Sequence, residues 1–296
     1  NTYIFFFSDH GGPLPRGKRS HYESGLKVPM IIRDPFERTM KYVDEPISFV
    51  DLAPTILSLS NVDIPDHFQG FAFMGNKKNK SLREYIFGSG DRFDETYDRV
   101  RSVISKDYVY VRNYHKNRPA YKDVLYRKNI DMTNEMLELY KNDMLNSDQE
   151  YWYRESKTKE EFYVRFQDPH SLNNVISDSK YINEIKRHRE ALKNWQDEIN
   201  DLGSEPEKKY LEHMWPDGNQ PKTQRPDIIF NDNIITIQPK TNGSSSAYII
   251  SDKDFNPDLD DGWQLYHKPI IINKGYIYVI STRLGFQDSD IVKIKL

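Results

Sequence analysis

The 296-residue sequence predicts a mixed α/β protein that ends in a small all-β region. Three patterns carry this prediction. Short apolar runs alternate with turns and one helix in residues 1–75, an amphipathic helix is expected at 181–199, and short strands without helical periodicity fill 222–296. The 42 basic and 45 acidic side chains nearly balance, which argues against a disordered chain and against a dedicated nucleic-acid binder. Cysteine is absent, so disulfides and thiolate sites are excluded within this sequence.

The first segment predicts two buried strands followed by a helix. Residues 3–7 are apolar and precede a Gly-rich turn, which is typical of a buried strand in a parallel sheet, and residues 28–32 predict a second such strand. Asp51 stands where a helix through residue 59 would begin. No apolar run is long enough to span a bilayer. A domain rarely starts on its central strand, so we expect the chain to be the C-terminal piece of a longer protein.

The middle segment, residues 81–203, predicts strands packed by a long helix. Residues 105–107 form a short hairpin connection, residues 121–161 have helical spacing, and the helix at 181–199 is expected to stop at Leu202 and Gly203. The charged stretch 91–101 is interpreted first as a solvated loop between two strands. The expected strands cover residues 85–87, 100–104, 108–111 and 162–166.

The C-terminal segment predicts a β-sandwich behind a linker. Residues 214–221 are rich in Pro and Gly, and no Glu follows Glu212. We therefore expect two domains, residues 1–213 and 222–296, with the first divided at about 75–81. An acidic loop at 252–261 lacks EF-hand spacing and is interpreted as solvated. The expected strands cover residues 234–237, 247–250, 270–272, 276–280 and 291–294.

The sharpest chemical feature follows the first strand. In open α/β sheets, ligands bind beyond the carboxyl ends of the strands, and Asp9 and His10 stand at such a place. Together they offer an oxygen and a nitrogen to a divalent cation. Taken alone, the Asp-His-Gly triplet is better explained as an Asx-turn with a solvated His.

The sequence around this turn favours the metal site over the Asx-turn. The chain continues with Pro-Leu-Pro-Arg-Gly-Lys-Arg at 13–19, Tyr-Glu at 22–23 and Val-Pro at 28–29. This register resembles the sulfatase family of the alkaline-phosphatase superfamily, in particular bacterial enzymes similar to heparan N-sulfatase and arylsulfatases. Residues 51–57, 91–101 and 166–175 are similar to further family segments, so the resemblance covers about residues 1–203.

The resemblance implies both a fold and a set of functional residues. It implies the C-terminal portion of an alkaline-phosphatase-like fold, with a small antiparallel sheet packed by a long helix. Asp9 and His10 match two metal ligands, and Ca²⁺ is the implied cation. Lys18 matches the lysine that contacts the sulfate group. Arg16 and Arg92 are our candidates for further substrate contacts.

The family's nucleophile is absent from this sequence. Family members carry a formylglycine made from Cys or Ser in a Cys/Ser-x-Pro-x-Arg motif, and this chain has no Cys and no Ser-x-Pro-x-Arg. The paired N-terminal aspartates of the metal site are also missing. We therefore expect a missing N-terminal half to supply these groups, and the chain alone to be inactive and to bind Ca²⁺ weakly.

The expected function is hydrolysis of a sulfate ester or sulfamate on a sulfated carbohydrate, in the periplasm, on the cell surface or outside the cell. No nucleic-acid partner and no membrane span are expected. Residues 222–296 resemble the small C-terminal β-domain of some hexosaminidases and sulfatases. Three alternatives stay open: a phosphodiesterase or phosphonate hydrolase of the same superfamily, a non-catalytic relative, and a carbohydrate-binding role for the β-domain.

Overall fold

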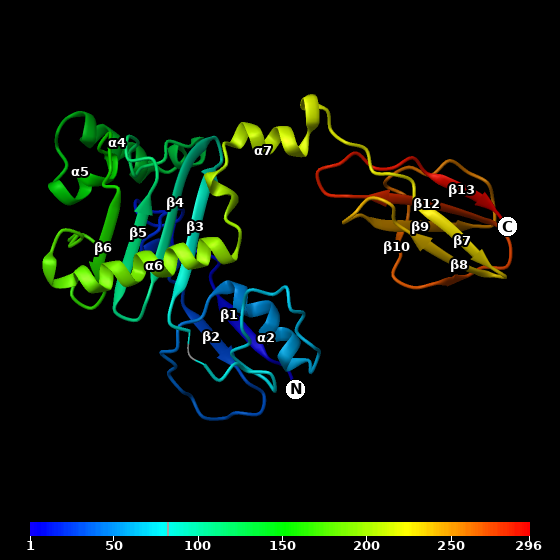
Figure 1. The fold of residues 1–296 in the computed structure, drawn as a ribbon, viewed down its shortest axis with the longest axis horizontal. Coiled ribbons are helices and arrows are strands. Elements are labelled where there is room, and N and C mark those ends of the chain that lie inside the picture. Colours follow the sequence, from blue (N-terminus) through cyan, green and yellow to red (C-terminus); the bar gives the residue numbers. More distant parts are fainter. Residues whose placement is uncertain (82) are drawn as a thin grey trace. The chain divides into compact units, whose positions relative to one another are not determined.

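The structure is a computed structural model that describes residues 1–81 and 83–296 (Figure 1). The chain divides into two compact units, Asn1–Gly203 and Ser204–Leu296. The stretch expected to be a linker belongs to the second unit, where α7 (Glu207–Met214) and η4 (Pro216–Gly218) form. The Trp215 indole N–H donates to the Gly285 carbonyl at 3.0 Å, which ties this stretch to the rest of that unit.

The first two strands, β1 (Ile4–Phe7) and β2 (Met30–Arg33), pair antiparallel. The prediction of a buried parallel strand is therefore wrong for the described residues. The connecting loop folds back on itself, with the Gly11 N–H donating to the Gly25 carbonyl at 3.0 Å, so the chain returns in the opposite direction. Both strands present apolar side chains to solvent: Phe6 is 68% and Ile31 is 65% exposed.

The predicted first helix is confirmed as η1 (Phe49–Asp51) followed by α2 (Leu52–Leu59). Buried Asp51 explains why the helix begins there. One of its oxygens accepts from the Ser48 N–H at 2.8 Å, the other accepts from the Phe71 N–H at 2.8 Å, and Arg83 forms an ion pair with it. Asp51 is therefore the N3 residue of a capping box in which Ser48 is the N-cap, and it also fixes the loop that follows the helix.

A four-stranded antiparallel sheet is the centre of the first unit, in the order β3-β4-β5-β6. It confirms the expected strands and the hairpin between β4 and β5. The first strands are longer than expected because β3 and β4 include the charged stretch 91–101, so the interpretation of that stretch as a loop is wrong. The strands are β3 (Ile86–Phe93), β4 (Thr96–Ile104), β5 (Tyr108–Asn113) and β6 (Glu160–Val164).

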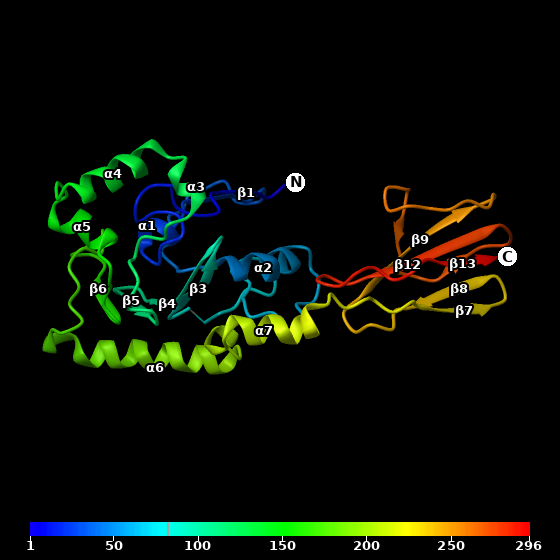
Figure 2. The same ribbon diagram turned by 90° about the horizontal axis from the view of Figure 1, so that it is seen from above.

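Helices cover both faces of this sheet (Figure 2). The long helix α6 (Ile182–Glu198), preceded by η2 (Ser179–Tyr181), packs Ile185 and Leu192 against Val103 and Phe162. It ends four residues before the expected stop, because Asn200 has a positive φ of 52° that breaks the helix. The region 121–161 forms three helices and then enters β6. The remaining helices of the unit are α1 (Glu23–Leu26), α3 (Leu125–Lys128), α4 (Asp131–Lys141) and α5 (Ser147–Tyr153).

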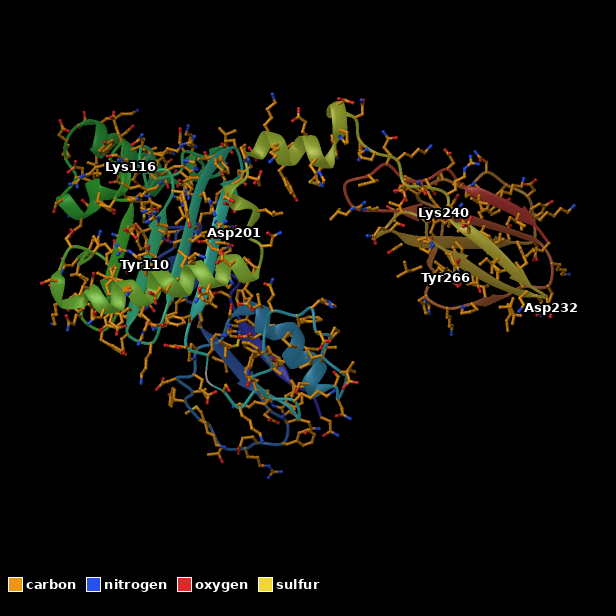
Figure 3. The ribbon with its side chains drawn as sticks, viewed as in Figure 1. Tyr110, Lys116, Asp201, Asp232, Lys240 and Tyr266 are labelled. Carbon is orange, nitrogen blue, oxygen red and sulfur yellow. The ribbon has the colours of Figure 1, made fainter. Side chains whose placement is uncertain are left out.

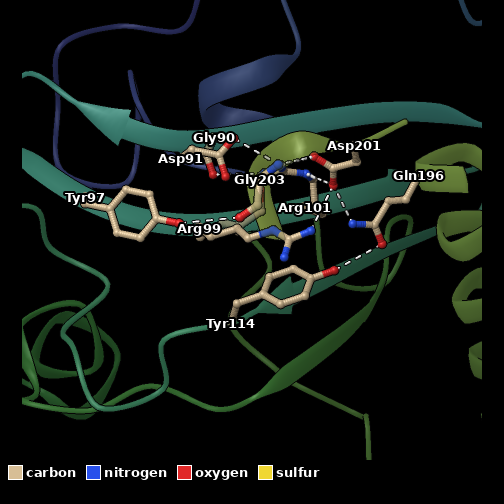
Figure 4. A network of polar contacts seen from close by, with 10 residues as sticks. Gly90, Asp91, Tyr97, Arg99, Arg101, Tyr114, Gln196, Asp201 and Gly203 are labelled. Carbon is tan, nitrogen blue, oxygen red and sulfur yellow. Dashed lines mark hydrogen bonds and ion pairs between the residues drawn. The ribbon is translucent and has the colours of Figure 1, made fainter. Parts of the chain in front are cut away.

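A buried ion network joins the sheet to the segment after α6 (Figure 4). The Arg101 side chain on β4 donates to Asp201 at 2.7 and 3.0 Å and to Asp91 at 3.0 Å, and Arg99 donates to Asp201 at 3.0 Å. Asp201 follows α6 at one end of the sheet (Figure 3). Burial acts to raise the pKa of Asp201, but the hydrogen bonds from Arg101 and its neighbours outweigh it and hold that pKa well below its usual range. A Cβ atom at Gly203 would lie 2.2 Å from Arg101 Nη2, so a larger residue there would displace the Arg101 side chain.

The second unit has two antiparallel sheets, β10-β9-β12-β13 and β11-β8-β7, around one apolar core. Ile235 and Ile237 of one sheet and Ile277 and Val279 of the other are buried in this core. The five expected strands are confirmed, and β7 and β10 were not expected. The unit contains β7 (Asp227–Asn231), β8 (Ile234–Gln238), β9 (Ser245–Ser251), β10 (Gln264–Leu265), β11 (Ile270–Ile271), β12 (Tyr276–Thr282) and β13 (Val292–Lys295), and η3 (Leu202–Ser204) lies at the boundary between the units.

In the part of the chain that the structure describes, no helix is both long enough and apolar enough to cross a membrane.

The buried ion network predicts a large stability cost for Asp201→Asn. The change leaves Arg99 and Arg101 buried without their shared carboxylate, and removing one partner of a buried pair costs about 3–5 kcal/mol. Guanidinium denaturation followed by circular dichroism measures the free energy of unfolding. Asp197→Asn, on the exposed side of α6, is the matched control and should change it by less than about 0.5 kcal/mol. Equal effects of the two variants would contradict the role of the network.

Candidate functional site

The loop between β1 and β2 holds the main chain of Lys18 from both sides. The Lys18 N–H donates to the Gly12 carbonyl at 2.8 Å, and the Lys18 carbonyl accepts from Arg127 Nη2 at 2.8 Å. Gly17 permits this turn because a Cβ atom there would lie 2.2 Å from the Gly12 carbonyl oxygen. The backbone position of Lys18 is therefore fixed, while its side chain forms no ion pair among the described residues.

The Lys18 side chain lies in a small pocket with two arginines. Its ammonium is 5.1 Å from the centre of the Tyr126 ring, and the Arg19 guanidinium is 4.8 Å from the centre of the same ring. Arg127 lines the pocket as well. The full lining is Pro13, Leu14, Pro15, Lys18, Arg19, Tyr121, Tyr126, Arg127, Ile130, Thr133 and Tyr153.

Positively charged side chains outnumber carboxylates around this pocket. Arg19 donates to Asp94 at 2.5 Å, but no described carboxylate pairs with Lys18 or Arg127. Arg127 is buried, with its guanidinium 5.7 Å from the centre of the Trp152 ring, and its burial lowers its pKa. Three cations with one carboxylate partner leave a net positive potential, which suits an anionic group.

Asp9 and His10 follow directly beyond the end of β1. His10 Nε2 is 3.4 Å from Asp9 Oδ2, and His10 Nδ1 is 2.7 Å from the Gly11 carbonyl oxygen. A proton on Nδ1, donated to that carbonyl, leaves the Nε2 lone pair beside the carboxylate. The Asp9 side chain is 81% exposed.

The chemistry of this pair fits a divalent cation, because it offers one carboxylate oxygen and one imidazole nitrogen. Among the described residues, however, no group of three or more His, Asp or Glu side chains is placed to hold a metal ion. The pair supplies two of the roughly six to eight ligands that Ca²⁺ takes.

The two candidate arginines lie outside this pocket. Arg16 donates to the Ser171 carbonyl at 2.7 Å and to the His170 carbonyl at 3.2 Å, and its guanidinium is 4.3 Å from the centre of the Tyr22 ring. Arg92, near the β3–β4 turn, donates to the Glu95 carbonyl at 3.2 Å. Neither lines the pocket that holds Lys18.

Sequence reasoning missed Arg127, Arg19 and Tyr126 as parts of the pocket. Arg19 could have been found, because it directly follows Lys18 in the same turn. Arg127 and Tyr126 come from α3, more than 100 residues along the chain, in a stretch with no motif that marks them.

Comparison with known proteins places these features in a family context. Residues 1–62 match the family model described as Sulfatase. The chain is 38% identical over 297 residues to an ulvan-active sulfatase of Formosa agariphila, covering 99% of this chain and 49% of that protein. It is 25% identical over 216 residues to human N-sulphoglucosamine sulphohydrolase, covering 68% of this chain and 42% of that protein. The chain thus spans about half the length of the curated relatives it matches.

A solved structure of a 2-O GAG sulfatase is also similar. The TM-score is 0.49 at 19% sequence identity, and the match covers 67% of this chain and 37% of that one.

The geometry of Asp9 and His10 predicts weak Ca²⁺ binding by the chain alone. Two donors cannot replace the hydration shell of the ion, so we expect a dissociation constant no tighter than about 1 mM. Isothermal titration with CaCl₂ measures this constant, and Asp9→Asn is the control that removes the carboxylate. Saturable binding in the micromolar range that Asp9→Asn abolishes would show that the chain holds a complete site.

Proposed function

We propose that the chain, which is similar to sulfatases along almost its whole length, is the C-terminal part of a sulfatase-family hydrolase that cleaves sulfate esters or sulfamates of sulfated carbohydrates. The observation that carries the proposal is the 38% identity over 99% of the chain to an ulvan-active sulfatase, and the position of Lys18 beside Arg19 and Arg127 supports it. The names of two relatives, which specify ulvan and N-sulphoglucosamine, support a saccharide substrate.

In this proposal Lys18 stabilises the charge on the sulfate group during hydrolysis. A nucleophile attacks sulfur, the bond from sulfur to the leaving atom of the sugar breaks, and the other sulfate oxygens carry negative charge throughout. A fixed ammonium beside one of these oxygens lowers the barrier because it needs no reorganisation. The main-chain bonds of Lys18 to Gly12 and Arg127 fix the backbone from which the ammonium extends, and the Tyr126 ring lies 5.1 Å from that ammonium.

The nucleophile and the remaining metal ligands are proposed to lie in another part of the enzyme. This chain has neither Cys nor Ser-x-Pro-x-Arg, from which the family's formylglycine would be made. A divalent cation, Ca²⁺ by resemblance, would take Asp9 and His10 as two ligands and would polarise the sulfate oxygens. The exposed apolar side chains of β1 and β2, such as Phe6 and Ile31, support a covering segment there. An N-terminal half of the same protein is the proposed source.

Family resemblance also supports export to the periplasm, the cell surface or the medium. The sequence of the part that carries the nucleophile distinguishes the remaining rivals. A Thr or Ser nucleophile without the formylglycine motif would favour a phosphodiesterase or phosphonate hydrolase. The absence of any nucleophile would favour a non-catalytic relative. Arg16 and Arg92 stay candidates for contacts to the sugar beyond the sulfate group.

The proposal predicts that Lys18→Ala disables the complete enzyme. Loss of one preorganised group that stabilises developing charge lowers turnover by about 10²–10³-fold. The measurement is kcat/KM of the full-length protein on an aryl sulfate. Lys186→Ala, an exposed lysine on α6, should leave it unchanged. An equal, small effect of both variants would remove Lys18 from the mechanism.

A groove in the second unit favours carbohydrate binding as a second candidate function. Lys222, Arg225 and Lys240 line it, and the buried Thr223 hydroxyl that also lines it has no hydrogen-bond partner among the described residues. Gln224 and Asp290 complete the lining. Asp290 pairs with Lys222 and Arg225, and Lys240 pairs with Asp227, so an anionic saccharide would exchange these ion pairs for its own. The proposed likeness to the hexosaminidase-type β-domain also supports carbohydrate binding.

This second function predicts that Arg225→Gln weakens binding of a sulfated disaccharide by about tenfold. Binding is measured by isothermal titration in a Lys18→Ala background, so that turnover does not consume the ligand. Arg283→Gln, outside the groove, is the control. Absence of binding to the starting protein, or equal binding by the two variants, would leave the second unit a structural role.

A further inference from the structure

The core of the first unit contains a buried carboxylate that accepts hydrogen bonds mostly from tyrosine hydroxyls. Glu161 on β6 is 1% exposed. Its Oε2 accepts from the hydroxyls of Tyr22 at 2.9 Å and Tyr163 at 2.8 Å. Its Oε1 accepts from Asn113 Nδ2 at 2.7 Å and from the Tyr151 hydroxyl at 3.2 Å.

These four donors make the burial of the charge tolerable. A buried carboxylate costs several kcal/mol unless hydrogen bonds replace the lost water, and here both oxygens are satisfied twice. Burial, followed by the charge of Glu161, raises the pKa of the Tyr22 phenol, and the same two causes raise that of Tyr163. Both hydroxyls therefore stay protonated and remain donors near neutral pH.

Tyr22 differs from the other three donors because it belongs to the loop that carries Lys18. Its two neighbours also dock on the sheet region. His21 Nδ1 is 3.2 Å from Ser102 Oγ, and Glu23 accepts from Arg165 Nη2 at 2.5 Å. Tyr22 is 5% exposed, so this end of the loop lies in the core, four residues beyond Lys18.

Contacts of Arg16 connect the buried Tyr22 to the part of the loop that contains Lys18. The guanidinium of Arg16 lies over the Tyr22 ring, and the Arg16 carbonyl accepts from the hydroxyls of Ser20 at 2.5 Å and Ser24 at 2.6 Å. The two residues that flank the Gly17–Lys18 pair, Arg16 and Arg19, have positive φ angles of 60° and 70°. A loop with such backbone angles keeps its shape only when its surroundings enforce it.

We propose that Tyr22 and Glu161 are positioning residues for Lys18. The hydrogen bond between them fixes the loop on the sheet, and thereby fixes where the Lys18 ammonium meets an anionic group. This inference rests on the proposed function, in which Lys18 contacts the sulfate. Neither residue lines the pocket, so both act through the loop and not by contact with substrate.

The test compares Tyr22→Phe with Tyr163→Phe. Each variant removes one hydroxyl that donates to the same oxygen of Glu161, but only Tyr22 lies in the loop. The accessibility of the Lys18 amine is measured by competitive acetylation of the chain and mass spectrometry, with the exposed Lys186 as internal reference. We expect Tyr22→Phe to change the labelling rate of Lys18 about fivefold or more and Tyr163→Phe to leave it nearly unchanged.

Equal changes in both variants, or no change in either, would overturn the proposal, because each result gives Tyr22 no special effect on Lys18. If Tyr22→Phe does not fold, Glu23→Gln provides the second test, since it weakens the adjacent anchor to Arg165 and should raise Lys18 labelling in the same way. Unchanged labelling in this folded variant would also contradict the anchorage.

A kinetic readout separates this inference from the proposed function. In the complete enzyme, Tyr22→Phe should lower kcat for an aryl sulfate more than it changes KM, whereas Tyr163→Phe should change neither beyond about twofold. Labelling needs no turnover. A changed labelling rate in an inactive protein therefore supports the positioning role while it counts against the proposed function.

Discussion

The first unit depends on two buried charges of opposite sign in one antiparallel sheet. Arg101 on β4 and Glu161 on β6 are each 1% exposed. A buried charge requires partners, and the partners come from distant parts of the chain: Asp201 after α6 for Arg101, and Tyr22 before β2 for Glu161. Satisfying these two charges therefore fixes the end of the long helix and the Lys18 loop on the same sheet.

This arrangement explains how a loop with little regular structure can hold a functional group in place. Residues 21–23 dock into the sheet region, and Lys18 itself is held through its main chain, which leaves its ammonium available. Preorganisation of this kind lets a charged group act without first being ordered by the substrate. In the proposed function, Arg127, which is buried near Lys18, would add to the attraction for the sulfate group.

The sequence allowed the local features to be predicted and hid the long-range ones. Apolar alternation located β4, β5 and β12 because this signal lies within a few residues. The motif spacing singles out Asp9, His10 and Lys18 in the same local way, and their roles stay predictions. The charged stretch 91–101 resembles a solvated loop in sequence because the partner that buries Arg101 lies 100 residues away. The antiparallel pairing of β1 with β2 likewise depends on how the intervening loop folds back, which periodicity does not encode.

The central claim, that the sheet holds the Lys18 loop rigid, is tested most directly by amide hydrogen exchange of the unmodified chain. The informative amides are those of Gly17, Lys18 and Gly25, which donate to carbonyls within the loop. If the loop is anchored, these amides exchange about as slowly as those in the middle of β4 and β5. Exchange at the rate of an open surface loop, while β4 and β5 stay protected, would contradict the claim.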